Sequence, residues 1–136
     1  MLTIIAPVRH ADQIFLSKRD LHTLADGIIL KDRSSIDRCV DFVVSESKGL
    51  WHGRARAMMC RRLKHCDFGR KQRAVLVEVI SGRLASGEFS EQFKDQLRLA
   101  MHLDMNATVA AAYRALKSSK GYVIRYAQWV LSHENL

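Results

Sequence analysis

The sequence predicts an all-α domain built from six or seven short helices. Apolar residues recur three and four positions apart along most of the chain, which is the period of one helix face. The single proline is Pro7, and the seven glycines fall mostly between the periodic stretches, as residues that interrupt helices do. A chain of 136 residues buries enough surface for one continuous core, so we expect a single domain over residues 1–136.

Start signals predict the first two helices. Residues 1–6 form either a short strand or a lead-in that ends at Pro7. Ser17 and Asp20 have the spacing of a capped helix start, and this helix ends near Gly27. A second start at residues 34–37 introduces a helix that closes at Gly49. The apolar residues at helical spacing in these two helices are Leu21, Leu24, Ala25, Ile36, Val40, Val43 and Val44.

Two more helices are expected in the middle of the chain. The third runs from about Leu50 to about His65, and the fourth begins at Asp67 as N-cap and ends at Gly87. Both have apolar stripes at intervals of three and four residues. The stripe residues are Ala55, Met59, Leu63 and Cys66 in the third helix and Phe68, Gln72, Val75, Leu76, Val79 and Ile80 in the fourth.

The last part of the chain predicts three further helices. Ser90 caps the fifth, Asn106 caps the sixth, and the seventh covers residues 122–132. The connections between helices are a few residues long, which places consecutive helices antiparallel. The fold class is therefore all-α, with stacked antiparallel hairpins arranged either as a compact bundle or as an open, repeat-like stack.

Residues 52–73 carry nearly all of the net charge. This segment has eight basic residues and one acid, whereas residues 1–51 have seven of each and residues 74–136 have seven basic and six acidic residues. Such a concentration of charge indicates an anionic partner. The basic residues are Arg54, Arg56, Arg61, Arg62, Lys64, Arg70, Lys71 and Arg73.

The helical period predicts that these cations form one anion-binding surface. Arg54, Arg61 and Lys64 lie opposite the apolar stripe of the third helix. Arg56 and Arg62 flank that stripe. Three others fall in the first two turns of the fourth helix, where the helix dipole disfavours cations and free amides suit phosphate. Trp51 is placed to stack at the edge of the surface. The predicted binding residues are Arg54, Arg61, Lys64, Arg70, Lys71 and Arg73.

The function that follows is a non-enzymatic binding module for nucleic acid or another polyanion. The alternative is a helical scaffold or adaptor whose basic surface holds an acidic protein. A third interpretation is a solvated face neutralised by the protein's own acids. Zinc-finger, RNA-binding-sheet and leucine-zipper patterns are absent, as are a serine triad and a phosphate-binding glycine loop. The acids of the first half that would neutralise the surface are Asp20, Asp26, Asp32, Asp37, Asp41 and Glu46.

Other residue groups favour structural roles. Cys60, His65 and Cys66 lack a second ligand pair at metal spacing, so we expect no metal or other cofactor. Cys66 also has a reactive interpretation, since it precedes a predicted helix start near arginines. The acid pairs Asp37 with Asp41 and Glu91 with Asp95 are helix neighbours, as surface acids often are.

The last predicted helix carries an aromatic stripe of Tyr122, Tyr126 and Trp129, which indicates core packing or, alternatively, a dimer or partner groove. Residues 123–131, Val-Ile-Arg-Tyr-Ala-Gln-Trp-Val-Leu, resemble the second helix of HEAT or armadillo repeats, although Ala127 follows Arg125 by two positions and not three. This resemblance covers the C-terminal half of the chain. It implies a partner-binding scaffold.

Composition also predicts the compartment. The apolar runs are too short for a membrane helix, so we expect no membrane partner. An odd count of three cysteines and an N-terminal apolar stretch too short for a signal peptide indicate a reducing, cytoplasmic setting.

Overall fold

The computed structural model describes residues 16–49, 51–89 and 92–134, and these residues form seven helices and no strand. The predicted all-α class is confirmed. The strand or lead-in expected over residues 1–6 lies outside the described residues, as does Ser90. The helices are α2 (Lys18–Ile29), α3 (Arg33–Val44), α4 (His52–Leu63), α5 (Arg70–Ser86), α6 (Lys94–Leu103), α7 (Met105–Ala115) and α8 (Gly121–Leu131).

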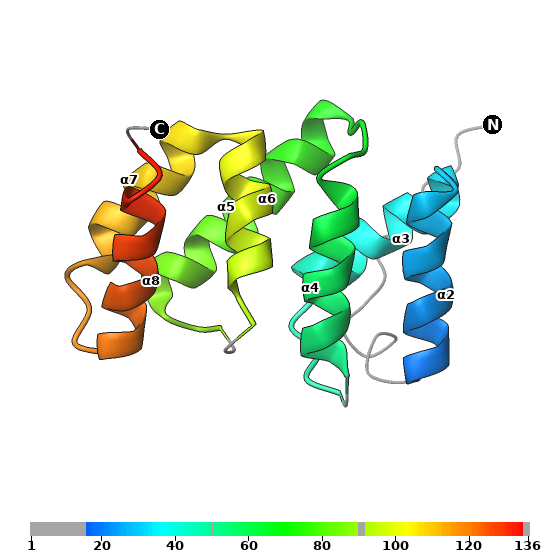
Figure 1. Cartoon of the computed structure of the whole chain (residues 1–136), viewed down its shortest axis with the longest axis horizontal. Coiled ribbons are helices and arrows are strands. Elements are labelled where there is room, and N and C mark those ends of the chain that lie inside the picture. The colour runs from blue at the N-terminus through cyan, green and yellow to red at the C-terminus, as the bar shows by residue number, and fades with distance from the viewer. Residues whose placement is uncertain (1–15, 50, 90–91, 135–136) are drawn as a thin grey trace.

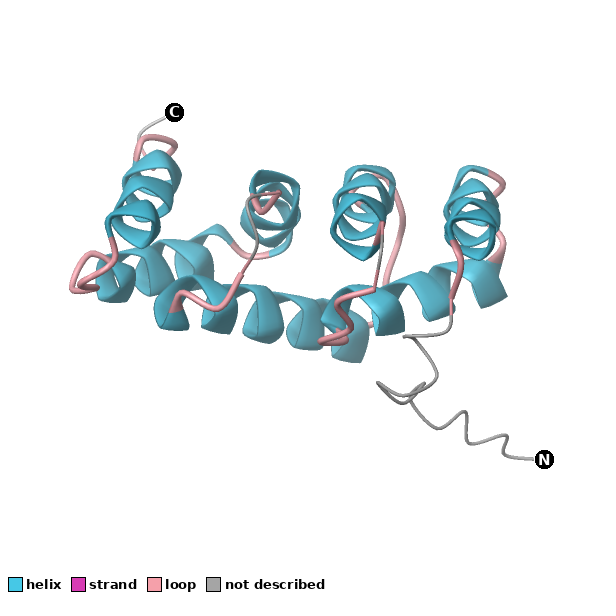
Figure 2. Ribbon diagram, turned by 90° about the horizontal axis from the view of Figure 1, so that it is seen from below, coloured by secondary structure: helices cyan, strands magenta, loops and turns pink. Residues whose placement is uncertain are grey.

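The helices form two layers (Figures 1 and 2). In the front layer α2, α4, α6 and α8 lie in a row, and in the back layer α3, α5 and α7 run behind them. Figure 2 shows the front helices end-on and the back helices lengthwise. Contacts join α2 with α4 and α4 with α6 in the front layer, α3 with α5 and α5 with α7 in the back layer, and most consecutive helices across the layers. The chain is therefore an open stack with α2 and α8 at opposite ends.

The start of α2 confirms the predicted capping signal. Ser17 Oγ accepts a hydrogen bond from the amide of Asp20 at 3.1 Å, and Asp20 Oδ2 accepts one from the amide of Ser17 at 3.0 Å. Each side chain thus satisfies a backbone N–H group that the helix leaves without a partner. These bonds stabilise the ionised carboxylate and lower the pKa of Asp20.

Three other helix starts differ from the sequence expectation. Asp32, not Ser34, caps α3 by accepting from the amide of Ser35 at 3.0 Å, and Asp104, not Asn106, caps α7 through the amide of Ala107 at 3.0 Å. In both cases the cap is a carboxylate two residues earlier in the sequence. A carboxylate accepts the hydrogen bond and is also stabilised by the positive end of the helix dipole. At α5 the N-cap is Gly69 and not Asp67.

Two helix ends also carry information. α3 stops at Val44, five residues before the expected stop at Gly49, because Ser45 is extended and its carbonyl accepts from Arg56 and Arg83. α5 ends at Gly87, as predicted, with a left-handed φ of 78°. A Cβ at Gly87 would lie 2.8 Å from Cγ2 of Val123 in α8, so this turn accepts only glycine without strain.

All seven helices contribute to one buried apolar cluster. Phe42 and Met59 are fully buried on the α2–α4 side, and Phe93 and Leu97 are fully buried toward α8. The predicted aromatic stripe packs against this cluster: Phe89 stacks on Phe93, and Tyr122 and Tyr126 meet the ring of Phe89 edge-on. The core lies between the layers, which leaves the outer face of the front layer to polar side chains.

Candidate anion-binding surface

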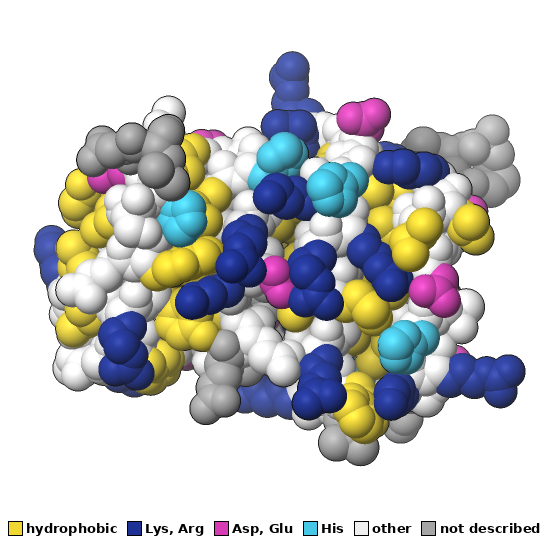
Figure 3. Space-filling model, in the orientation of Figure 1, with side chains coloured by type: hydrophobic (Ala, Val, Ile, Leu, Met, Phe, Trp, Pro, Cys, Tyr) yellow, Lys and Arg dark blue, Asp and Glu magenta, His cyan; other side chains and the backbone are white. Residues whose placement is uncertain are grey.

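The outer face of the front layer is rich in cations. Figure 3 shows this face, with lysine and arginine side chains gathered over the centre of the row, where α4 and α6 lie. The reason lies in the pattern of α4. Ala55, Met59 and Leu63 are buried toward the other helices, whereas Arg54 and Arg61 are exposed on the opposite side. The predicted amphipathic arrangement of this helix is therefore present.

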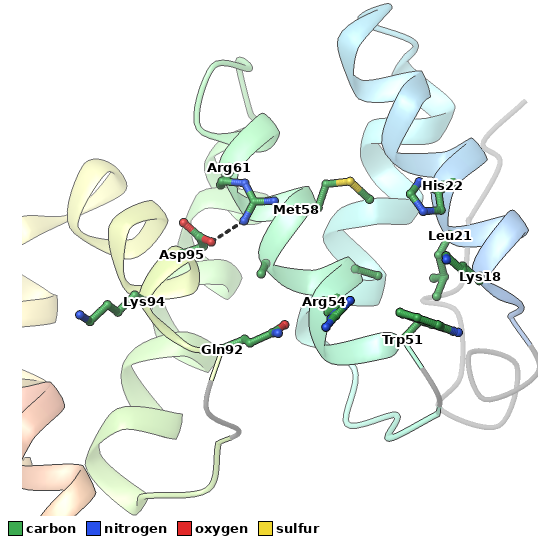
Figure 4. Close-up of a pocket in the computed structure, with 12 residues that line it drawn as sticks. Lys18, Leu21, His22, Trp51, Arg54, Met58, Arg61, Gln92, Lys94 and Asp95 are labelled. Atoms are coloured by element: carbon green, nitrogen blue, oxygen red, sulfur yellow. Dashed lines mark hydrogen bonds and ion pairs between the residues drawn. The ribbon is translucent and has the colours of Figure 1, made fainter.

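A hollow of about 600 Å³ opens on this face between α2, α4 and α6 (Figure 4). Its lining combines four lysine and arginine side chains with one acid, and Met58 and Trp51 add apolar surface. The excess of positive charge in a concave site focuses the electrostatic field on anions. The charged lining residues are Lys18, Arg54, Arg61, Lys94 and Asp95.

Trp51 organises the α2 side of the hollow. Lys18 Nζ lies 4.1 Å from the ring centre, and the guanidinium carbon of Arg54 lies 5.3 Å from it. Both cations are within the range of attraction to the electron-rich ring. Trp51 is itself the N-cap of α4 with a left-handed φ of 70°, a conformation that costs a non-glycine residue about 1 kcal/mol. Stacking of Trp51 on a ligand stays a prediction, with two cations already at the ring.

Asp95 joins α4 to α6 at the centre of the surface. Its two carboxylate oxygens accept from Arg61 Nη1 at 2.7 Å and from Arg98 Nη1 at 3.0 Å. The Asp95 side chain is only 15% exposed, but the two arginines are 57% and 48% exposed. One partly buried carboxylate thus holds two exposed guanidinium groups in place. The group retains one net positive charge.

A second aromatic ring supports the α6 side. Lys94 Nζ and the guanidinium carbon of Arg98 each lie 5.2 Å from the ring centre of Trp129, which belongs to α8. Lys18, Lys94 and Arg98 were not predicted as binding residues, because they lie outside the basic segment of the sequence. The spacing of Lys94 and Arg98, four residues apart on one helix face, was the available signal.

The six predicted binding residues lie in different parts of the structure. Arg54 and Arg61 line the hollow, and Lys64 is half-buried at the C-cap of α4. The other three, in the first turns of α5 in the back layer, are exposed and lie outside the lining of the hollow. Their membership of the binding surface stays a prediction. These three are Arg70, Lys71 and Arg73.

Internal pairing takes up part of the basic segment. Arg62 Nη1 contacts Asp26 Oδ1 of α2 at 3.2 Å, so one of the acids of the first half does neutralise a basic residue. Arg56, predicted to flank the apolar stripe, is 8% exposed. Asp37 pairs with Arg33 and accepts from Gln72, away from the hollow. Among the described residues, no acid of the first half lines the hollow, whose one acid is Asp95.

The cysteines follow the packing interpretation. Cys39 and Cys60 are buried, and burial raises the pKa of Cys39 to about 12 and also raises that of Cys60. Cys66 is half-buried and donates to the carbonyl of Arg62. Among the described residues, no cluster of three or more histidine, cysteine, aspartate or glutamate side chains has the arrangement of a metal site.

Comparison with family models, curated proteins and solved structures finds no match to this chain. In the described part of the chain, every helix is too short or too polar to cross a membrane.

Proposed function

We propose that this protein is a non-enzymatic binding module that engages nucleic acid or another polyanion through the outer face of α2, α4 and α6. The observation that supports the proposal is the hollow lined by Lys18, Arg54, Arg61 and Lys94 against one acid, Asp95. Three of the predicted basic residues at the start of α5 extend the proposed surface. Contacts are chiefly to phosphates, because lysine and arginine groups of this density read charge and not base edges.

The arrangement of the cations favours binding over solvation. Free lysine and arginine side chains lose about 2 kcal/mol of conformational entropy when a ligand fixes them. Here Trp51 holds Lys18 and Arg54, and Asp95 holds Arg61, before any ligand arrives. Part of that entropy is therefore lost on folding, and the surface is preorganised for anions.

The second candidate is an acidic protein partner. It is favoured by the apolar surface of Met58 and Trp51 inside the hollow, which suits an apolar side chain of a peptide whose acids meet the surrounding cations. The chain would then act as a scaffold or adaptor, as the predicted repeat-like stack implies.

Charge reversal tests the proposal. Arg54→Glu changes the charge in the hollow by two units, each worth about 0.7 kcal/mol at about 6 Å from a phosphate, so affinity falls about tenfold. Arg70→Glu tests in the same way whether the start of α5 contributes to binding. Arg114→Glu is the matched control, because Arg114 is exposed on α7 in the back layer. Binding is measured by fluorescence anisotropy with labelled duplex DNA and single-stranded RNA.

Competition separates the two candidates. Heparin, duplex DNA, RNA and an acidic peptide are each tested for direct binding in labelled form and then as competitors of one another. Displacement by all polyanions supports the polyanion proposal, and binding of the acidic peptide alone contradicts it in favour of the adaptor. If Arg54→Glu and Arg114→Glu weaken binding equally, the hollow is not the binding site.

A further inference from the structure

A second hollow, of about 750 Å³, lies where the α3–α4 connection meets the α5–α6 connection. Figure 1 shows both connections at the lower edge of the stack. This hollow has no lining residue in common with the one between α2, α4 and α6. Two arginines from the core, Arg56 of α4 and Arg83 of α5, form part of its wall, and each is 8% exposed. Arginine is seldom buried to this extent without a full set of partners.

Arg83 has partners for four of its five N–H donors. Its Nη1 donates to the carbonyl of Val43 and to Gln96 Oε1, both at 2.8 Å. Its Nη2 donates to the carbonyl of Ser45 at 2.9 Å and to Glu46 Oε1 at 3.2 Å. The carbonyls belong to the C-terminal end of α3, where a cation is favoured by the helix dipole. Arg83 therefore has a structural role at the end of that helix.

Arg56 does not. All of its hydrogen bonds come from Nη2, which donates to the carbonyl of Ser45 at 3.0 Å, to Ser45 Oγ at 3.1 Å and to Ser47 Oγ at 2.6 Å. Its Nε and Nη1 have no hydrogen-bond partner among the described residues, and Nε is buried. Three of the five N–H donors of this guanidinium group thus have no partner among the described residues, and one of them, on Nε, is on a buried atom. Unmade hydrogen bonds of a buried cation are costly.

The surroundings make the cation costlier still. Burial and then the charge of Arg83 lower the pKa of Arg56 to about 10, so the group stays protonated at neutral pH. Its main carboxylate neighbour, Glu46, is bonded to Arg83 and has a side chain 67% exposed. An anion entering the hollow would supply a compensating charge and a hydrogen-bond acceptor for this guanidinium group, whose Nη1 is not among the buried atoms without a partner.

We propose that this hollow is a binding site for a carboxylate group, with Arg56 as the central donor. The charged residues of the lining are Lys48, Arg56, Arg83, Glu46 and Glu88, which leaves one net positive charge. That charge matches a monoanion, whereas a phosphate monoester would bring nearly two negative charges next to two glutamates. Ser47 lies beside the donor, and Phe89 offers an apolar wall for the rest of the ligand. This site is independent of the proposed polyanion surface.

The test uses the side-chain Nε–H signal of Arg56 in ¹H–¹⁵N NMR spectra of the whole chain. The probes are acetate, N-acetylglycine and N-acetylglycinamide, the last of which is the neutral match of the second. We expect the two carboxylates to shift the Arg56 signal with saturation and the amide to leave it unchanged. Equal or tighter binding of acetate indicates a small-molecule carboxylate, and tighter binding of N-acetylglycine indicates a peptide C-terminus. Both results support the carboxylate site.

Charge variants at the rim provide a second readout that does not disturb the buried arginines. Lys48 and Glu88 are exposed residues of the lining. Lys48→Ala is expected to weaken N-acetylglycine binding about threefold, and Glu88→Gln to strengthen it about threefold, for one charge at about 6 Å. Lys117→Ala, an exposed lysine outside the lining, is the matched control with unchanged binding.

Three outcomes would overturn the proposal. The first is an equal response to N-acetylglycine and its amide, which would mean that the carboxylate is not recognised. The second is the absence of any shift of the Arg56 signal with either carboxylate. The third is tighter binding of inorganic phosphate than of acetate at equal ionic strength, which would contradict the monoanion assignment.

Discussion

Replacing Asp95 with asparagine tests the charge of the proposed surface directly. Asp95 is the one acid in the lining of the hollow between α2, α4 and α6, and it contacts both Arg61 and Arg98. Asparagine keeps the shape and one oxygen acceptor but removes the negative charge. If the surface binds polyanions, Asp95→Asn should therefore tighten binding.

The size of the effect follows from the geometry. A phosphate on the outer side of Arg61 would lie about 6 Å from the Asp95 carboxylate, where one unit of repulsion in a water-like medium is about 0.7 kcal/mol. Its removal strengthens binding about threefold. If a released arginine contacts one more phosphate of duplex DNA, the slope of log affinity against log salt becomes steeper by about 0.9. The free energy of unfolding should fall by only about 1 kcal/mol, because both arginine partners are half exposed.

The assay is fluorescence anisotropy with a labelled duplex over a series of salt concentrations, together with urea denaturation. Glu78→Gln is the control, because it makes the same change in net charge at an exposed position of α5 outside the hollow. A threefold gain in Asp95→Asn only would support the surface. Weaker binding by Asp95→Asn, or an equal gain in both variants, would refute the reasoning.

Three further predictions concern the same fold. Trp51→Gly should weaken polyanion binding, measured by anisotropy, because the ring beside Lys18 and Arg54 is lost. The free energy of unfolding, measured by urea denaturation, should change by less than about 1 kcal/mol, because glycine adopts the left-handed φ without strain. Gly87→Ala should lower the free energy of unfolding by about 1 to 3 kcal/mol, since its φ is 78° and the new Cβ meets Val123; an unchanged urea midpoint would contradict this. Above about pH 9 the free energy of unfolding should fall with rising pH. The Cys39 thiol, with a pKa of about 12, keeps its proton in the folded protein, whereas the same thiol in the unfolded chain, with a pKa near 9.0, loses it. Cys39→Ser should therefore make the free energy of unfolding less dependent on pH.

The helices were predictable because local sequence patterns mark each of them. Apolar spacing and the Ser17 cap identify α2, and Gly87 identifies the end of α5. The starts of α3 and α7 were misplaced by two residues, because several adjacent polar residues are acceptable caps and only the three-dimensional path of the chain selects Asp32 and Asp104.

The candidate site was predictable only in part. Charge density identified Arg54 and Arg61, but not Lys18, Lys94 or Arg98, which reach the same face because alternate helices share a layer. That arrangement is a property of the stack and not of any single segment. Arg56 looked like the other arginines of its helix, and its burial follows from the path of the α3–α4 connection, which bonds to its guanidinium group.

The layered arrangement also has a mechanical consequence. Because α2 contacts α4 and α4 contacts α6, the front row has two separate helix–helix interfaces, and any bending of the row would change the packing at one of these seams. A long ligand that contacts Lys18 at one end and Lys94 at the other would cross both seams at once. Such a ligand would hold α2, α4 and α6 in fixed relative positions, which would make the row stiffer and fix its curvature.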